Sequence, residues 1–411
     1  MKNTSKILLF TLLAVMSGSA LAEVKPVTLE DITAHVSTQN YYVQENAERV
    51  YQAKKTIQLS RRNLLPKINL WRILGGFSNP LGLVEDVAPF LVPNNWLRVK
   101  EDKVLATASV HGYRALWANE LLTARGLLIQ SSLDERLLEQ LQENAKDFEP
   151  LYSVIQLREN LGTAPSGSIQ QFEVRRLALN EEINTLATII KSNRSELAYI
   201  LGFPGNDEAV PTGVKYFEKS EAHPLRYEDY EERLLSASYE LKQHTSLIQA
   251  ANLIRKSRYF NFLGVSTMSR GAYGNIFDGL PQQDGLGFGL GPSVQIVRSQ
   301  KRILESQKRG IEETLRKNLK VLVDSYNLDL QLREDALQRI QATQSQWQTL
   351  TDRMNLGAKI DVFDLIEASR NRIEAVSSYY SIETRLHLGS DRLKRLTYTD
   401  AYQVVEGSLP K

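Results

Sequence analysis

Cysteine is absent from this 411-residue chain, and the formal net charge is only +2. Without cysteine no disulfide can form, so side-chain packing alone must hold the fold together. The small net charge gives no strong global field that would attract nucleic acid or anionic lipid. After residue 22 the sequence has no run of about 18 apolar residues. That absence excludes a transmembrane helix and leaves strands closed into a barrel as the way to cross a membrane.

Signatures of catalysis are also missing. The five histidines are scattered, and no zinc-binding, nucleophile-elbow or phosphate-loop pattern occurs. Glycines 287, 289 and 291 alternate with bulky residues as in a strand, and no Gly-Lys-Ser follows them. The sequence therefore predicts no enzyme activity, no cofactor and no metal site. The basic run from Arg298 to Arg302 favours a helix start facing solvent or a membrane boundary over a nucleic-acid site.

Residues 1–22 have the features of a secretory signal peptide. A lysine-bearing start precedes an apolar stretch at 7–15, and Ala20 and Ala22 supply small residues for cleavage. The apolar stretch is short for a membrane anchor, so cleavage is favoured over an uncleaved helix, and the mature chain is expected to start at Glu23. Because no cysteine follows this site, the mature N-terminus cannot carry a lipid anchor there.

The rest of the chain repeats one plan twice. Arg158 to Gly162 and Arg353 to Gly357 share the pattern Arg-x-x-Leu-Gly, and an apolar–Glu pair follows each by about ten residues. The first half opens with a capping pattern from Thr28 to Asp31, and the second with a proline followed by acids. We therefore predict a first repeat at 23–202, an inter-repeat segment at 203–223, a second repeat at 224–397 and a C-terminal tail at 398–411.

Very long helices form the middle of each predicted repeat. Apolar residues recur at steps of three and four, for example Leu133 and Leu137 in the first and Leu315 and Leu319 in the second. This spacing gives the apolar stripe of a packed or coiled helix. A soluble helical bundle or coiled coil would show the same periodicity. We predict long helices at about 102–158 and 298–354, and closing helices at about 168–201 and 361–397.

Each repeat also has two segments with strand character. Leu286 to Gly291 alternates strictly between bulky residues and glycine. Prolines weaken the pattern of the first pair, in which Trp71 and Trp96 fit either interfacial anchors or packing aromatics. Four strands from one chain cannot close a barrel, and lipid does not tolerate open strand edges, so a membrane role requires several chains. The predicted segments are about 67–76, 88–100, 259–269 and 284–297.

The order and spacing of these segments resemble the TolC-like outer-membrane efflux protein family. The resemblance rests on the opening at Thr28 to Asp31, the helix end at Asn63 to Leu70, the run Leu290 to Ile296 and the turn Asn355 to Ala368. It covers essentially all of the mature chain. No single motif is diagnostic, but their order, spacing and duplication together are specific.

The resemblance implies a mainly α-helical protein with a small β part. Each protomer of a homotrimer would give four β-strands to a shared twelve-stranded barrel in outer-membrane lipid, with long helical hairpins in the periplasm. At the hairpin tips the family docks a periplasmic adaptor (membrane fusion) protein carried by an inner-membrane pump or ABC exporter. The implied function is a passive, gated conduit of a tripartite efflux or type I secretion system. The alternative is a periplasmic helical scaffold whose degenerate barrel does not insert.

Candidate functional residues follow from the same resemblance. Arg158, Gly162, Arg353 and Gly357 fall at the predicted periplasmic tip turns, where the glycines end helices with positive φ. The arginines fit a gate or an adaptor contact, and equally cations that complement a helix C-terminus.

The closing helices carry a candidate aperture gate. Asp364 and Glu367 are three residues apart on one helix face, and their first-repeat equivalents are Gln170 and Glu173. In a trimer these carboxylates would form rings that select cations. The alternative is a solvated helix start, where acids favour the helix dipole.

Overall fold

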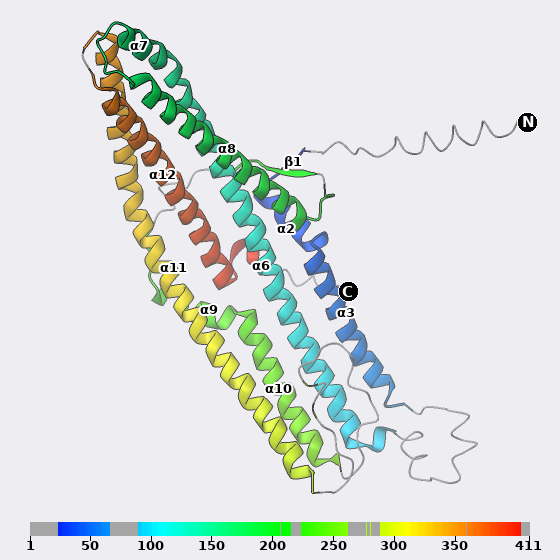
Figure 1. The fold of residues 1–411 in the computed structure, drawn as a ribbon. Helices are drawn as coiled ribbons and strands as arrows, with labels where there is room; N and C mark the ends of the chain where they lie inside the picture. Colours follow the sequence, from blue (N-terminus) through cyan, green and yellow to red (C-terminus); the bar gives the residue numbers. More distant parts are fainter. Residues whose placement is uncertain are drawn as a thin grey trace, which may run out of the picture. The chain divides into compact units, whose positions relative to one another are not determined.

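Helices dominate the part of the chain that the computed structural model describes, which is residues 24–65, 89–205, 207–214, 223–261, 277, 280, 288–358 and 360–403 (Figure 1). The chain divides into two compact units. Unit 1 comprises Met1–Asn40, Thr123–Pro224 and Tyr326–Ser390. Unit 2 comprises Tyr41–Leu122, Leu225–Ser325 and Asp391–Lys411. Each unit takes segments from both predicted repeats, whose boundaries remain predictions.

The order of helices is the same in both halves of the chain. A helix of 10 residues is followed by one of 22 or 21, then by long helices, and then by a closing helix of 33 or 36. The first half has α2 (Leu29–Thr38), α3 (Tyr41–Arg62), α6 (Pro93–Lys146), α7 (Phe148–Asn160) and α8 (Ser168–Ile200). The second half has α9 (Glu228–Ala237), α10 (Tyr239–Tyr259), α11 (Leu290–Asn355) and α12 (Val362–Thr397). The predicted long and closing helices are thus confirmed, although the first long helix is divided at Asp147 and the long helices start at Pro93 and Leu290 rather than at about 102 and 298.

The helix starts follow the capping rules of the sequence. Thr28 closes a capping box: its Oγ1 accepts from the Asp31 N–H at 3.3 Å, and the Asp31 carboxylate accepts from the Thr28 N–H at 3.0 Å. Ser238 caps α10 by accepting from the Leu241 N–H at 3.2 Å. Short 3₁₀ turns, η2 (Pro89–Leu91) and η5 (Asp400–Tyr402), flank the helical part.

The long and closing helices of both halves end alike. At each end a residue with positive φ lets the following N–H reach the carbonyl five residues back, at 2.9 or 3.0 Å. The four residues in this left-handed conformation are Gly162, Gly202, Gly357 and Tyr398. Each turn thereby satisfies carbonyl groups that the end of a helix leaves without partners.

One pair of short strands joins the start of the described chain to the predicted inter-repeat segment. β1 (Val24–Val27) runs parallel to β2 (Glu208–Pro211), with Val24 opposite Glu208. An ion pair of 2.7 Å between Lys25 and Asp207 closes the end of this ladder. Both strands belong to unit 1.

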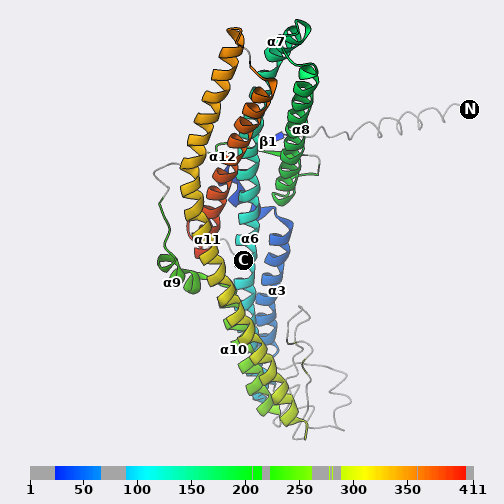
Figure 2. The same cartoon turned by 60° about the vertical axis from the view of Figure 1, so that its left-hand side comes forward.

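Each unit has its own core. In unit 1, helices α7, α8, α11 and α12 surround a buried cluster that includes Phe148, Phe172 and Trp347. In unit 2, α10 runs beside the first part of α11 in both views (Figures 1 and 2). Ile254 and Val297 are buried at that contact. No described helix has an 18-residue stretch that is apolar enough to span a membrane.

Two strand predictions are wrong where the structure describes them. Residues 93–100 form the first turns of α6, and residues 290–297 form those of α11. Pro93 and Pro292 lie in these first turns, where a missing N–H costs no helical hydrogen bond. Of the other expected strand residues, 259–261 close α10, 89–92 contain η2 and 288–289 form a turn before α11. The remaining ones lie outside the described chain.

A comparison of two glycines tests the close contact between α8 and α2. A Cβ at Gly202 (φ +72°) would lie 2.4 Å from the backbone oxygen of Gln39, whereas one at Gly213 (φ +76°) would meet nothing within 4 Å. We expect Gly213→Ala to cost about 1–2 kcal/mol of folding free energy, the penalty of a left-handed alanine. Gly202→Ala should cost more, because the Gln39 backbone must also move. Thermal unfolding followed by circular dichroism measures both, and equal losses would contradict the contact.

Candidate functional site

Two tip turns lie at the same end of unit 1 (Figures 1 and 2). The first is residues 161–167 between α7 and α8, and the second includes residues 356–358 and 360–361 between α11 and α12. Gly162 has φ +69° and Gly357 has φ +85°, a region that glycine enters without a Cβ penalty. The predicted tip residues therefore lie close together in space although they are 195 positions apart.

Arg158 connects the two tip turns directly. Its Nη1 donates to the carbonyl of Ala358 at 2.9 Å, and its Nη2 donates to the carbonyl of Met354 at 2.7 Å. These carbonyls belong to the end of α11, where a guanidinium both satisfies free acceptors and complements the helix dipole. Arg353, the equivalent residue of the second repeat, is exposed. The two predicted arginines thus have different environments.

Glu159 fastens the first tip turn, and sequence reasoning missed it. Its carboxylate accepts from the N–H of Gly167 at 2.8 Å and from the N–H of Ile169 at 2.9 Å. The cap position of α8 is Gly167, which has no side chain to perform this task. These two backbone hydrogen bonds lower the pKa of Glu159 below its ordinary value of 4.5.

The second tip turn is closed locally instead. Asp361 precedes α12, and its Oδ1 accepts from the N–H of Phe363 at 3.0 Å. This side chain–backbone bond spans two residues and is the usual way in which an aspartate opens a helix. The two turns therefore reach similar shapes through different side chains.

An aromatic core lies beneath the turns. The ring of Phe148 stacks on Phe172, with centroids 4.9 Å apart, and on Trp347 at 6.2 Å. Arg372 covers the Trp347 ring at 5.7 Å and pairs with Asp147 at 2.7 Å. Because these residues come from α7, α8, α11 and α12 and the segment before α7, the core holds both hairpins in one body.

The candidate gate residues differ in how their charge is balanced. Asp364, Glu367 and Gln170 are exposed. Glu173 is half-buried and forms a two-pronged contact with Arg176, at 2.6 and 2.9 Å. This partner lowers the pKa of Glu173. Of the two equivalent pairs, only Asp364 and Glu367 therefore present two exposed carboxylates.

Exposed apolar side chains mark both tip turns. Leu161 is 67% exposed and Leu356 is 86% exposed, and each directly precedes a turn glycine. Phe363, beside the second turn, is 59% exposed. Single exposed apolar residues are common, but three at one end of a unit, two of them equivalent in sequence, indicate a contact surface.

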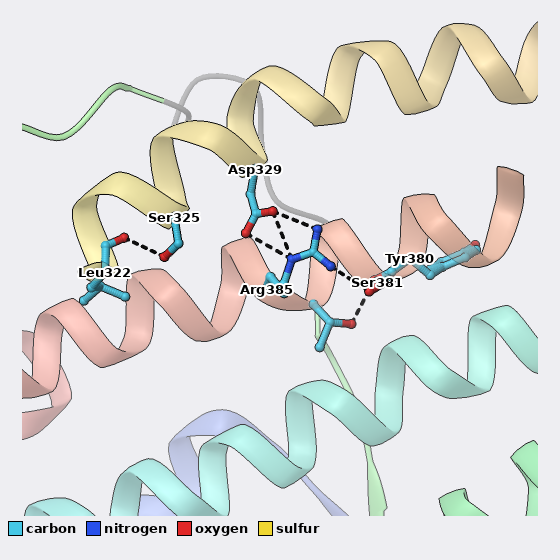
Figure 3. Close-up of polar contacts among 7 residues, drawn as sticks. Leu322, Ser325, Asp329, Tyr380, Ser381 and Arg385 are labelled. Carbon is cyan, nitrogen blue, oxygen red and sulfur yellow. Dashed lines mark hydrogen bonds and ion pairs between the residues drawn. The ribbon is translucent and has the colours of Figure 1, made fainter. Parts of the chain in front are cut away.

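Ion pairs hold α11 against α12 within unit 1. Arg385 of α12 grips Asp329 of α11 with Nε and Nη2, at 2.9 and 2.8 Å (Figure 3). One turn further along α11 the polarity is reversed, because Arg333 donates to the fully buried Glu383 at 2.5 Å. Bidentate and buried pairs of this kind fix the register of two helices.

The described residues contain no group of three or more histidine, aspartate or glutamate side chains that fits a metal ion. The geometry of the tip region is one of helix ends, hydrogen-bonded turns and exposed leucines.

Comparison with solved structures identifies the fold. Over 92% of its length the chain matches the outer-membrane channel CmeC of Campylobacter jejuni, over 89% of that chain, with a TM-score of 0.72 and 10% identity. It matches the open-state channel MtrE of Neisseria gonorrhoeae over 90% of this chain and 88% of that one (TM-score 0.67, 14% identity). It matches the Vibrio cholerae outer membrane protein VceC over 90% of this chain and 95% of that one, with a TM-score of 0.68 and 10% identity.

Sequence comparison alone gives no relative. No protein-family model and no curated protein matches the chain. The matches to solved structures confirm the predicted resemblance to TolC-like proteins as a likeness of fold.

Acid should loosen the first tip turn. Because the pKa of Glu159 is lowered in the folded protein, its contribution is complete above the ordinary value of 4.5 and is lost as the pH falls through the lower folded value. We expect protection of the Gly167 and Ile169 amides against hydrogen exchange to fall in that range. Glu159→Gln should lower this protection at neutral pH, and the exposed Glu149→Gln should not. Protection that is independent of pH and of Glu159→Gln would refute the role.

Proposed function

We propose that this protein is the outer-membrane channel of a tripartite efflux or type I secretion system, exported through a cleaved signal peptide and extending far into the periplasm. The observation that carries this proposal is the likeness to outer-membrane channels over 90–92% of the chain. The protein is a passive conduit and not an enzyme, and partner proteins supply the energy.

Contacts between helix ends in unit 2 support the proposal that this part of the channel meets the membrane. The side-chain amide of Asn94, at the start of α6, donates to the side-chain oxygen of Asn261, which follows α10, at 3.0 Å. The two helix ends next to the predicted strand pairs are therefore neighbours. Ser60 of α3 donates to Asp102 of α6 in the same region. The contacts join the ends of α3, α6 and α10. Two pairs of strands that start from one place are what a shared barrel requires of each protomer.

Exposed apolar residues surround these helix ends. Tyrosine and tryptophan are typical of membrane interfaces, where an apolar ring and a polar atom meet lipid and water together. Trp96, 52% exposed, donates its indole N–H to the carbonyl of Phe90 at 2.8 Å, which supports the anchor interpretation; Trp71 lies outside the described residues. The exposed set is Leu59, Leu65, Phe90, Leu91, Trp96, Tyr259, Phe260, Phe288 and Ile296.

The tip turns of unit 1 form a second functional region. We propose that Leu161 and Leu356 dock the periplasmic adaptor, because both are exposed, apolar and placed on turns that glycine and backbone hydrogen bonds hold in shape. In the homotrimer each tip would be presented three times. The adaptor in turn would connect the channel to an inner-membrane pump or ABC exporter.

The closed state depends on two features of the tips. Arg158 ties the first hairpin to the end of α11, so the hairpins cannot part without losing two charge-assisted hydrogen bonds. Asp364 and Glu367 would face the threefold axis as rings of carboxylates, which attract cations at the constriction.

One observation favours the scaffold alternative. Residues 93–100 and 290–297, expected to be strand, are helical. That leaves shorter stretches for strands that need about 9–11 residues to cross a bilayer. A periplasmic scaffold that does not insert would keep the helices and lose conductance, so conductance separates the two functions.

Channel activity is the direct test. We expect a heat-sensitive trimer in outer-membrane extracts that gives cation-selective currents in planar bilayers. Asp364→Asn with Glu367→Gln should lower the cation selectivity several-fold, because the charged rings are removed. The exposed pair Glu181→Gln with Glu196→Gln, which changes the charge equally, should leave it unchanged. A soluble periplasmic monomer without conductance would support the scaffold instead.

Release of the tip tie should open the channel. Arg158→Ser removes both bonds to the end of α11, each worth about 1.5–3 kcal/mol when charge-assisted. We expect larger single-channel conductance or longer open times. Arg353→Ser, at the equivalent exposed position, should raise conductance less. Conductance of Arg158→Ser equal to that of the unchanged protein would remove the tie from the gate.

A further inference from the structure

A cavity of about 350 Å³ lies between α10 and α11 in unit 2. We call it the basic pocket, and it is lined by Arg255, Gln295, Arg298, Lys301, Arg302 and Glu305. Arg255 comes from α10 and the others from the second to fifth turns of α11. The pocket is therefore built by two packed helices and not by one helix end. Its volume is sufficient for a small polar group.

The charge of the basic pocket is not balanced. Four cations face one carboxylate, and that carboxylate, Glu305, is held by Lys301 at 3.3 Å. Arg298 donates to the hydroxyl of Tyr259 at 3.2 Å, which is a neutral partner. Within the described chain no carboxylate pairs with Arg255, Arg298 or Arg302. Guanidinium groups in this arrangement match the oxygens of a phosphate group, which they bind by two parallel hydrogen bonds.

Apolar side chains beside the basic pocket narrow the class of ligand. Tyr259, whose hydroxyl accepts from Arg298, lies beside the pocket. Tyr259 and Phe260, at the end of α10, are 47% and 39% exposed. A free anion would gain nothing from contact with such apolar side chains. An anionic lipid would contact both kinds of residue, because its headgroup can bind the cations and its acyl chains can pack against the apolar side chains.

The position along the helices agrees with a membrane surface. Arg255 is four residues from the end of α10, about 6 Å, and Arg298 is eight residues from the start of α11, about 12 Å. The chain beyond both ends leads to the second predicted strand pair. Headgroup regions are several ångströms thick, and extended arginines bridge the remaining distance.

We propose that the basic pocket binds the phosphate of an anionic phospholipid headgroup at the membrane surface, with Arg298 and Arg302 as the principal ligands. The proposal rests on the proposed function, because that function places the ends of α10 and α11 at a membrane. It adds a lipid-binding site that fixes the depth of the channel in the bilayer.

Short-chain phosphatidylglycerol below its micelle concentration is the probe, titrated into the full-length protein in neutral detergent at low salt by calorimetry. Arg298→Gln with Arg302→Gln should weaken binding about 30-fold, because each basic residue near an anionic lipid contributes roughly fivefold. Lys317→Gln with Lys320→Gln makes the same charge change at exposed positions further along α11 and should change the affinity less than twofold. The zwitterionic phosphatidylcholine should bind much more weakly than phosphatidylglycerol. Circular dichroism establishes that each variant is folded.

Equal loss of affinity in both double variants, or no loss in either, would overturn the proposal. Inorganic phosphate that displaces the lipid at equal concentration would overturn it as well, because the pocket would then bind free anions. Conductance of the unchanged protein tests the proposed function separately. If the unchanged protein conducts but the variant Arg298→Gln with Arg302→Gln binds lipid with unchanged affinity, only the lipid site is disproved. If the unchanged protein binds the lipid selectively but does not conduct, only the channel function is disproved.

Discussion

The carbonyl groups at the ends of long helices are the constraint on which the tip region depends. Four such ends are closed by turns in which a residue with positive φ brings the next N–H back to a helical carbonyl. At one of them a further partner is added, because Arg158 reaches two carbonyls of another helix end. The same groups that any helix must satisfy therefore also join two hairpins.

Residues at equivalent positions of the two predicted repeats differ in their contacts. Arg158 is bonded and Arg353 is exposed. Glu173 is balanced by Arg176, whereas the second-repeat pair has exposed carboxylates. Each pair of equivalent residues thus has one member that is bonded within the chain and one that is exposed. That difference is the reason for assigning the proposed carboxylate rings to the second repeat, whereas the proposed tie and docking leucines draw on both.

The two units place different chemistry at helix ends. In unit 1 the ends are closed by hydrogen bonds and expose leucines, as suits contact with protein. In unit 2 they carry exposed aromatic residues and an unbalanced group of arginines, as suits a lipid surface. The channel proposed above would meet an adaptor with one part and a membrane with another, and it would need this contrast.

The sequence by itself determined the helices, their order and the turn glycines, because helical periodicity, caps and glycine turns depend on residues three to five positions apart. The prediction of a strand at 290–297 is wrong, because a six-residue alternation of bulky residues and glycine is too short a signal to outweigh a proline that suits the first turn of a helix. Only the tertiary structure decided which side chains work together. Arg158 finds its acceptors 196 and 200 residues away, and Arg385 finds Asp329 56 residues away. Such partners leave no local pattern, because packing of separate helices brings them into contact.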